Sequence, residues 1–511
     1  GVPVVESFVE HEARDAVYPL LVKAAAGGGG RGMRIVTRPE DLDGALESAR
    51  REALTGFGDD RVFAERFLPR ARHIEVQVIA DAHGTVLYLG ERECSLQRRH
   101  QKVMEESPSP VVSPQLRAAL GAEAVALARA AGYVNAGTVE FIADYDDPAE
   151  HFFLEMNARL QVEHPVTELV TGLDLVELQL RVAAGEPLPI GQDKVALVGH
   201  AIEVRVTAED ASRGFLPAAG RVLAYVRPDD TYDVRVDDAI EVGTVVDTTY
   251  DSLLAKVIAH GADRPQALAR LERALAGFTV LGVTTTTWYL RGLLADEAIR
   301  AGDLDTGLVD RRGVPAGPMG DEDVAIAAAM LILAERAARA GDEGGQDPWH
   351  RVDGWRLGGV RAPSHWRMSV AGGEPVEVSV PQEYVAMVSP LGDGRFAIEG
   401  RGEWLLAHDG DVSWIGHGGS AWAVRAGSAV DVAGAAAADG AVRAPMPGQV
   451  LLVHAQAGDR VIAGDPLVVL ESMKMELVLT APVAGEVAEL TVAVGDKVAV
   501  DQPLARVEAS P

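Results

Sequence analysis

Residues 442–509 contain an internal repeat, and this repeat constrains the fold more than any other feature of the chain. Three short stretches occur twice in the same order: Ala444–Val450 and Ala481–Val487, Gly458–Val461 and Gly495–Val498, and Pro466-Leu467 and Pro503-Leu504. The second copy always begins 37 residues later, because 481 − 444, 495 − 458 and 503 − 466 all equal 37. Two similar halves of short strands predict a flattened β-barrel with a pseudo-two-fold axis.

Lys474 lies in the segment that joins the two halves, Glu471–Glu476, within two residues of the midpoint between Ala444 and Val507. We expect a pseudo-symmetric barrel to place this lysine at an exposed hairpin turn, far from both termini. A modifying enzyme can reach such a turn, and a group tethered there can swing. The simpler interpretation, an ordinary solvated lysine, is disfavoured by the repeat, the central position and the two flanking methionines.

The Met473-Lys474-Met475 triplet and the Ala444–Pro447 segment upstream of it resemble biotin-carboxyl-carrier domains. Lipoyl domains share this architecture but normally carry Asp-Lys-Ala at the turn. The resemblance implies that biotin is attached covalently to Lys474 by a biotin protein ligase. Flexible, apolar methionine side chains are suited to contact both the ligase and the ureido ring of biotin.

The segment Glu155–Glu163 alternates polar and apolar residues, as a half-buried strand does. We expect one face to carry the polar set Glu155, Asn157, Arg159, Gln161 and Glu163. A solvated face is the simpler interpretation of this set. However, Glu155 and Asn157 offer hard oxygen ligands for Mg²⁺, Arg159 is a planar anion binder, and Glu163 is a candidate base. Function is therefore favoured, with a predicted strand at 137–142 offering a further carboxylate, Glu140.

A glycine-rich loop, Gly27–Gly32, matches the pattern G-x-G-x-x-G. A dinucleotide site of this kind should open a helix, but Met33–Val36 has the pattern of a strand. The loop is not a P-loop either, because no Gly-Lys-Ser/Thr follows. A glycine hairpin between two strands can still cover phosphates with backbone N–H groups, and Lys23 can neutralise them. A merely mobile hairpin is the alternative.

Residues 1 to about 310 resemble the ATP-grasp core of biotin carboxylases. The segments that carry the resemblance are Lys23–Met33, Gln97–Lys102, Glu155–Pro165 and Gly199–Arg205. The resemblance implies an ATP site made by Lys23, Gly28, Gly29, Gly30, Glu65, Leu68, His73, Gln97 and His100. Glu65 and Leu68 would contact the adenine, and the others the remainder of ATP. Without the surrounding motifs, His73 and His100 would be interpreted as ordinary surface or turn histidines.

The same resemblance implies the remaining roles in the site. Glu140, Glu155 and Asn157 would hold Mg²⁺ or Mn²⁺, and the bicarbonate site would be formed by Arg159, Gln161 and Val162. The catalytic set would be Glu163, Arg159, Arg205 and Lys102. In that set Glu163 acts as the general base for bicarbonate, Arg205 stabilises the biotin enolate, and Lys102 assists the phosphate chemistry.

The remaining sequence predicts further units. Residues 321–340 have the pattern of an alanine-rich helix, and residues from about 350 to 428 that of short strands with glycine turns. Asp347–Arg356 resembles the inter-domain region of acyl-CoA carboxylase alpha subunits, particularly the methylcrotonyl-CoA type, which implies docking of a separate carboxyltransferase beta subunit. The protein is therefore expected in a hetero-oligomer.

The predicted fold class is α+β and multidomain. An ATP-grasp core precedes a helix with a small antiparallel β-barrel, and a flattened biotinyl/lipoyl β-barrel closes the chain. The expected boundaries are 1–68 for an ATP-grasp lid, 69–312 for the ATP-grasp core and carboxylase C-terminal region, 320–428 for the inter-subunit domain, 429–441 for a linker and 442–509 for the carrier.

Composition excludes several classes of function. The formal net charge of −29 disfavours nucleic-acid binding, despite a basic cluster at Arg98–Lys102, because phosphate contacts need many clustered cations. No apolar run reaches the roughly 18 residues that a membrane helix needs. One cysteine, Cys94, fits a reducing compartment, so a cytoplasmic protein is expected.

These features lead to one preferred function and two alternatives. The preferred function is ATP- and bicarbonate-dependent carboxylation of biotin on Lys474, followed by transfer to an acyl-CoA on a separate subunit. Because the chain opens at Gly1 within the family pattern, we expect an N-terminal carboxylase domain, with a further ATP-contacting lysine, to be missing. The first alternative is therefore a non-catalytic carrier and assembly module with an incomplete ATP site. An NAD-dependent oxidoreductase is a remote second alternative.

Overall fold

The structure is a computed structural model. It describes residues 1–26, 33–99, 101–228, 233–247, 249–314, 319–340, 364–370, 376–427, 440–472, 475–499 and 502–509. Five predicted site residues lie outside these ranges, namely Gly28, Gly29, Gly30, His100 and Lys474.

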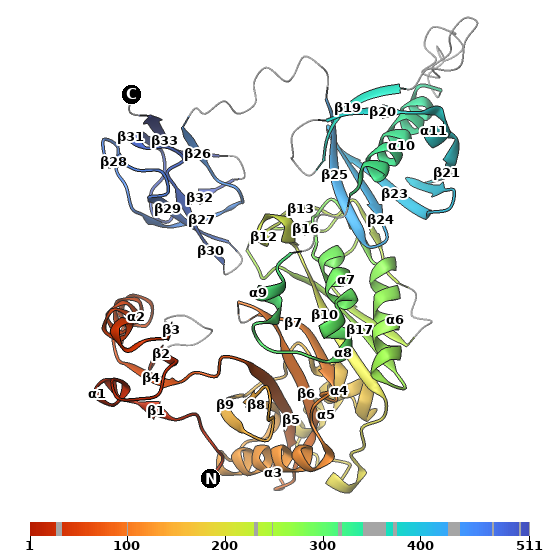
Figure 1. The fold of residues 1–511 in the computed structure, drawn as a ribbon. Helices are drawn as coiled ribbons and strands as arrows, with labels where there is room; N and C mark the ends of the chain where they lie inside the picture. Colours follow the sequence, from red (N-terminus) through yellow and green to blue (C-terminus); the bar gives the residue numbers. More distant parts are fainter. Residues whose placement is uncertain are drawn as a thin grey trace, which may run out of the picture.

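The N-terminal unit is a small antiparallel sheet covered by a helix (Figure 1). Its strand order is β1 (Ser7–Phe8), β4 (Val62–Arg66), β2 (Leu20–Ala24) and β3 (Arg34–Val36). The sheet packs its apolar face on α2 (Leu42–Phe57), and a shorter helix, α1 (Glu10–Ala13), follows β1. The predicted strands on both sides of the glycine loop therefore exist and pair with each other.

The central body is built on an eight-stranded antiparallel sheet. Its order is β15 (Val234–Asp238), β17 (Leu253–Gly261), β10 (His200–Thr207), β7 (Gln101–Ser107), β6 (Val86–Arg98), β5 (Ala71–Ala80), β8 (Asn135–Asp144) and β9 (His151–Asn157). Short two-stranded sheets pair β11 (Glu209–Asp210) with β12 (Leu216–Pro217), β13 (Gly220–Arg221) with β16 (Val245–Val246), and β14 (Ala224–Val226) with β18 (Thr279–Leu281).

Helices cover this sheet and begin where the sequence supplies start signals. They are α3 (Pro114–Ala130), α4 (His164–Thr171), α5 (Leu175–Ala183), α6 (Arg264–Gly277), α7 (Thr287–Ala295), α8 (Glu297–Ala301) and α9 (Leu308–Arg312). Ser113 caps α3 by accepting a hydrogen bond from the Leu116 N–H, with Pro114 in the first turn. Asp263 caps α6 in the same way, through the Gln266 N–H.

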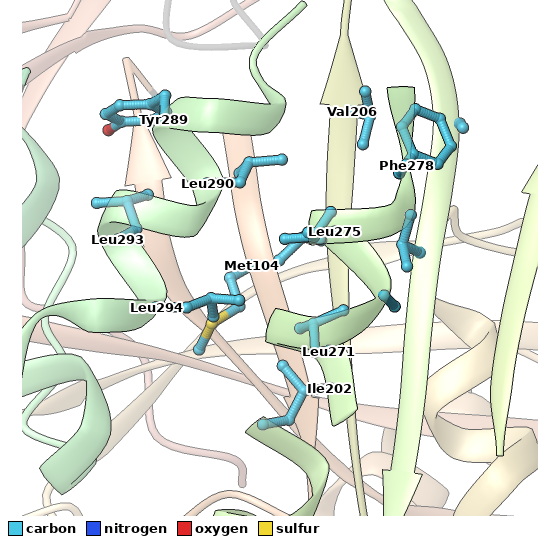
Figure 2. Close-up of a cluster of buried hydrophobic side chains, with 14 of the residues drawn as sticks. Met104, Ile202, Val206, Leu271, Leu275, Phe278, Tyr289, Leu290, Leu293 and Leu294 are labelled. Atoms are coloured by element: carbon cyan, nitrogen blue, oxygen red, sulfur yellow. The ribbon is translucent and has the colours of Figure 1, made fainter. Parts of the chain in front are cut away.

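The largest core of the body fixes the two strands that later supply the site (Figure 2). Met104 of β7 and Ile202 of β10 pack against Leu271 of α6 and Leu294 of α7. Because side chains alternate along a strand, burial of this face directs the opposite face of β7 and β10 to the other side of the sheet. That opposite face carries charged residues, including Arg205.

The third unit confirms the predicted helix with antiparallel strands. The helix α10 (Asp321–Ala340) packs against a seven-stranded sheet in the order β20 (Val376–Val380), β19 (Ser364–Val370), β25 (Ser420–Gly427), β24 (Val412–His417), β23 (Gly402–Asp409), β22 (Arg395–Ile398) and β21 (Val388–Gly392). A short helix, α11 (Gln382–Met387), connects β20 to β21. Alanines and isoleucines of α10 lie fully buried against Trp404, which stacks on His417 at a centroid distance of 4.6 Å.

The carrier unit has the predicted two-fold organisation. One four-stranded sheet has the order β26 (Ala441–Arg443), β33 (Pro503–Ala509), β31 (Gly485–Leu490) and β28 (Arg460–Val461). The other has the order β30 (Met475–Thr480), β29 (Pro466–Ser472), β27 (Gly448–Val453) and β32 (Lys497–Val498). Strands β31, β32 and β33 begin 37 residues after β27, β28 and β29, since 485 − 448, 497 − 460 and 503 − 466 are equal. The repeat therefore maps one sheet onto the other.

No helix in the described ranges is both long enough and apolar enough to cross a membrane.

Candidate functional site

The charged face of the central sheet gathers acidic residues from three neighbouring strands. Along β5, Ile74, Val76 and Val78 lie in the core, so His73 and Glu75 point to the opposite side. Glu75 lies directly opposite Glu140 of β8, and Glu140 lies directly opposite Glu155 of β9. Antiparallel register therefore places three carboxylates in a row across the sheet.

Lys102 of β7 sits at the centre of these acids. Its Nζ donates to Glu75 Oε2 at 2.5 Å, to Glu163 Oε1 at 2.5 Å and to Glu140 Oε1 at 3.2 Å. Burial alone would lower the pKa of Lys102, but the surrounding carboxylates outweigh it and raise the pKa well above its ordinary value. The ammonium group is therefore fixed in its charged form.

Glu163 is held between two cations. One carboxylate oxygen accepts from Lys102, and the other accepts from Arg205 Nη2 at 3.0 Å. Arg205 also donates through Nε to Glu105 Oε1 at 2.7 Å. Burial opposes the charge of Arg205, but Glu105 and Glu163 raise its pKa above the ordinary value. Glu163 itself is only 2% exposed, so its carboxylate is shielded from bulk water.

The structure of the segment from Glu155 to Glu163 differs from the predicted single strand. The strand β9 ends at Asn157, so the expected alternation from Glu155 to Glu163 along one strand is wrong. The chain leaves the sheet there, because α4 begins at His164 with a proline in its first turn and Glu163 as the residue before it. Gln161 and Glu163 consequently turn into the buried cluster, whereas Arg159 is exposed and donates to the Leu160 carbonyl at 3.3 Å.

A second buried cation, Arg92 of β6, ties this segment to the sheet. Its Nε donates to Glu75 Oε1 at 2.5 Å, and its Nη2 donates to Gln161 Oε1 at 2.7 Å. Gln161 in turn donates to Glu140 Oε1 at 2.8 Å. Val162 contributes its carbonyl, which accepts from Lys256 Nζ at 2.8 Å.

His73 and Gln97 join the same cluster. Gln97 Nε2 lies 3.0 Å from His73 Nδ1, and His73 Nε2 lies 3.3 Å from Glu140 Oε2. Burial would lower the pKa of His73, but Glu140 and Glu75 outweigh it and raise the pKa to about 9. The imidazole is therefore a cation at neutral pH in this arrangement.

The donor set fits a magnesium or manganese ion. Glu140 and Glu155 face each other in register, and Asn157 Nδ2 lies 3.2 Å from Glu155 Oε1. Carboxylate and amide oxygens are the ligands that Mg²⁺ prefers, so the three predicted metal residues supply suitable chemistry at one edge of the cluster.

Three predicted ATP residues lie in or beside the N-terminal unit. Lys23 of β2 forms an ion pair with Glu65 of the neighbouring strand β4. Leu68 is buried just beyond the end of β4. The structure thus brings Lys23 and Glu65 into contact with each other.

Sequence reasoning missed Glu75, Arg92 and Glu105, and also Glu203 of β10, which lies directly opposite Glu105 of β7. The signal for Glu75 was present, because His73, Glu75 and Gln77 alternate with Ile74, Val76 and Val78. Glu203 and Arg205 alternate with Ile202, Val204 and Val206 in the same way. Nothing in the sequence pairs these strands, so the contacts between them could not be predicted.

Four family profiles match successive parts of the chain. Residues 4–191 match "Carbamoyl-phosphate synthase L chain, ATP binding domain", and residues 203–311 match "Biotin carboxylase C-terminal domain". Residues 321–429 match "Methylcrotonyl-CoA carboxylase, alpha-subunit, BT domain", and residues 440–507 match "Biotin-requiring enzyme".

Curated relatives align with nearly the whole chain and therefore across all of these parts. The methylcrotonoyl-CoA carboxylase subunit alpha of Dictyostelium discoideum is 36% identical over 504 residues, which cover 92% of this chain and 71% of the relative. The propionyl-CoA carboxylase alpha chain of Caenorhabditis elegans is 37% identical, over 91% of this chain and 69% of the relative. The chain belongs to the alpha subunits of biotin-dependent acyl-CoA carboxylases. This alpha subunit is accordingly an ATP-dependent ligase that combines a biotin carboxylase region with a biotin-carrier domain.

Solved structures support the same conclusion for the alpha subunit's fold. The biotin carboxylase domain of Hydrogenobacter thermophilus 2-oxoglutarate carboxylase, in complex with MgADP, ADP and bicarbonate, superimposes with a TM-score of 0.58 and 40% identity. The match covers 61% of this chain and 70% of that one. The predicted ATP-grasp core is therefore confirmed. The helix with antiparallel strands that follows it and the biotinyl/lipoyl domain at the end are confirmed by the sheets and the family profiles.

Proposed function

We propose that the charged cluster around Lys102 is where bicarbonate is activated and biotin is carboxylated. The observation that carries this proposal is the setting of Glu163, a buried carboxylate with one oxygen on Lys102 and the other on Arg205. These two cations hold the carboxylate in a fixed orientation. Both cations also line a neighbouring cavity. A carboxylate so placed is suited to accept a proton from a bound acid such as bicarbonate.

The proposed chemistry uses the chain's own residues for binding, orientation and proton transfer. Bicarbonate would be bound by Gln161, the Val162 backbone and Arg159, with Glu163 taking its proton as it attacks the γ-phosphate of ATP. Lys102 would remain charged and stabilise the negative charge that develops on the transferred phosphoryl group. For Arg159 this role requires its exposed side chain to turn toward the cluster when the anion binds.

A divalent ion held by Glu140, Glu155 and Asn157 would neutralise phosphate charge when it is bound. Arg205 would stabilise the negative oxygen of the deprotonated biotin ureido group, because its guanidinium keeps its charge although it is largely buried. Lys23, Glu65, Leu68, His73 and Gln97, together with the glycines 28–30 and His100, stay predictions for ATP contacts.

Lys474 is the proposed attachment site of biotin. It lies outside the described residues, but the strands on either side support the assignment: Ser472 at the end of β29 pairs with Met475 at the start of β30. A lysine between two directly paired strand ends can present a tethered group away from the barrel. A biotin protein ligase would attach the cofactor.

The remaining partners follow from the relatives. The unit at 321–429 resembles the BT domain of methylcrotonyl-CoA carboxylase alpha subunits. We therefore propose that it docks a carboxyltransferase beta subunit in a hetero-oligomer and that a methylcrotonyl-type acyl-CoA is the final acceptor. The relatives named above are mitochondrial, so the cytoplasmic location stays a prediction.

The test is bicarbonate-dependent ADP release by the full biotinylated chain. Glu163→Gln keeps the size of the side chain but removes the base, and we expect ADP release to fall by about 10²- to 10⁴-fold. The matched control is Glu177→Gln, an exposed glutamate of α5 paired with Arg181, which should leave the rate unchanged. No bicarbonate-dependent turnover in the wild-type chain, with Lys474 still biotinylated, would instead favour the carrier and assembly module.

A further inference from the structure

One loop connects the cavity beside the site to the carrier domain. The cavity is lined by Lys102, Arg205 and Phe215, among others. The next residue in the chain, Leu216, packs against the buried apolar cluster of the carrier domain. Figure 1 shows its strand, β12, on the side of the central body that faces the carrier. Two consecutive side chains therefore face the cavity and the carrier, respectively.

The backbone of this loop is held in an unusual conformation. Phe215 has φ = 63°, in the left-handed region that bulky residues rarely adopt. Its ring is fixed from two sides, by the Arg98 guanidinium 3.9 Å from its centroid and by an edge-to-face contact with Tyr289 at 4.9 Å. Its N–H donates to the Asp210 carbonyl at 2.8 Å. Surrounding contacts thus determine a conformation that the loop would not favour alone.

The consequence of this conformation is the direction of Leu216. With Phe215 anchored and Leu216 paired with Asp210 in the β11–β12 ladder, the leucine is held outside the cavity. Leu216 is only partly buried even with the carrier in contact, as expected for a side chain that bridges two domains. An apolar side chain held in place costs little conformational entropy when it meets a partner surface.

We propose that Leu216 is a docking contact through which the carboxylase region receives its own carrier domain. This inference rests on the proposed function, because docking has a purpose only if biotin on the carrier is carboxylated at the neighbouring site. The occupant of the contact is the apolar carrier barrel, residues 440–509. Leu216 acts as a positioning residue, since it touches the carrier and not the reacting atoms.

Carboxylation of carrier-bound biotin can be separated from carboxylation of free biotin. In Leu216→Asp we expect single-turnover transfer of labelled bicarbonate to biotin on Lys474 to slow by about tenfold, as for loss of a central apolar interface contact. ATP-dependent carboxylation of free biotin should stay at the wild-type rate. The milder Leu216→Ala should slow carrier carboxylation less. Leu180→Asp, at an exposed leucine of α5, is the matched control and should change neither rate.

A second measurement does not depend on activity. Cys94 is buried, so a cysteine placed at Leu216→Cys can be labelled selectively with a photoreactive maleimide. Irradiation of the full chain should crosslink this position to peptides from residues 440–509. The same label at Leu180→Cys should give no carrier crosslinks.

The outcomes distinguish the two proposals. Equal loss of both activities in Leu216→Asp, or no loss in either, would overturn the docking contact, as would crosslinks that avoid the carrier. A wild-type chain that carboxylates neither free nor carrier-bound biotin would overturn the proposed function. The crosslinks would then still decide whether the carrier docks at Leu216.

Discussion

The carrier domain and the carboxylase site use opposite kinds of interior. Within the described part of the carrier, the buried residues are apolar except Ser472. The central sheet instead buries charged side chains, among them Glu75, Arg92 and Glu106. Buried charges are tolerated only when they are paired and hydrogen-bonded, and they contribute little net stability even then. The difference is what the proposed roles require, since the charged cluster would carry out chemistry and the carrier would need only a stable barrel to present the proposed biotinylated lysine.

The largest effect is expected from removing Lys474, the proposed attachment site of biotin. Lys474→Ala should abolish biotinylation completely, measured as loss of the mass increase seen after expression with a biotin ligase. Because the carboxylase site is built on other strands, free biotin should still be carboxylated at the wild-type rate. A mass increase that survives the substitution would mean that the modified residue was misassigned.

The next largest effect concerns the buried charges. Arg92→Met removes the partner of Glu75 and Gln161 in the sheet, and we expect it to lower the free energy of unfolding by about 3–5 kcal/mol. The carrier counterpart is Arg506→Met, which removes an ion pair with Glu508 from a half-exposed arginine. That change should cost no more than about 0.5 kcal/mol in denaturant titrations. An equal loss of unfolding free energy in the two variants would contradict the difference between the buried charges of the sheet and the exposed charges of the carrier.

The carrier and the site also differ in how far the sequence could predict them. The fold of the carrier was predictable because its two halves repeat in the sequence, and the repeat predicted the strands and their two-fold arrangement together. In the site, residues came from motifs, but their partners did not. Glu75 contacts Lys102 and Arg92 only because antiparallel strands bring them together, which no local pattern shows. Arg159 was misplaced because periodicity alone did not reveal that β9 ends at Asn157.

An apolar substitution in the carrier tests whether the carrier unfolds independently of the central sheet. Leu470 is fully buried in β29, and Leu470→Ala should destabilise the carrier by about 2–4 kcal/mol through lost burial and a residual cavity. Hydrogen exchange should increase within 440–509 and remain unchanged in β5–β8. Faster exchange in the central sheet as well would show that the two regions unfold as one unit.

The smallest expected effect is a pH dependence of the free energy of unfolding that arises from Glu106, a buried carboxylate outside the proposed metal site. Burial would raise the pKa of Glu106, but a hydrogen bond from His200 at 2.6 Å and the Arg264 guanidinium lower it below its ordinary value. A lowered pKa stabilises the fold above the unfolded-state value of about 4.3 and loses that contribution as the pH falls through the folded-state value.

Glu106→Gln should therefore be less stable than wild type at neutral pH. The difference in free energy of unfolding between the two proteins should become smaller as the pH falls below about 5. Denaturation midpoints measured across this range check the prediction. Glu177→Gln, at the surface, serves as the control and should follow the wild-type curve. A stability difference that grows as the pH falls would contradict a lowered pKa of Glu106 as its cause.

The two regions act together if the site around Glu163 carboxylates biotin held on Lys474, as proposed. The direct measurement is incubation of the full biotinylated chain with ATP, magnesium and labelled bicarbonate, followed by identification of the labelled peptide. We predict label on the peptide that contains Lys474, dependent on ATP and lost in Glu163→Gln. A biotinylated wild-type chain that acquires no label, or one whose label persists in Glu163→Gln, would contradict the claim.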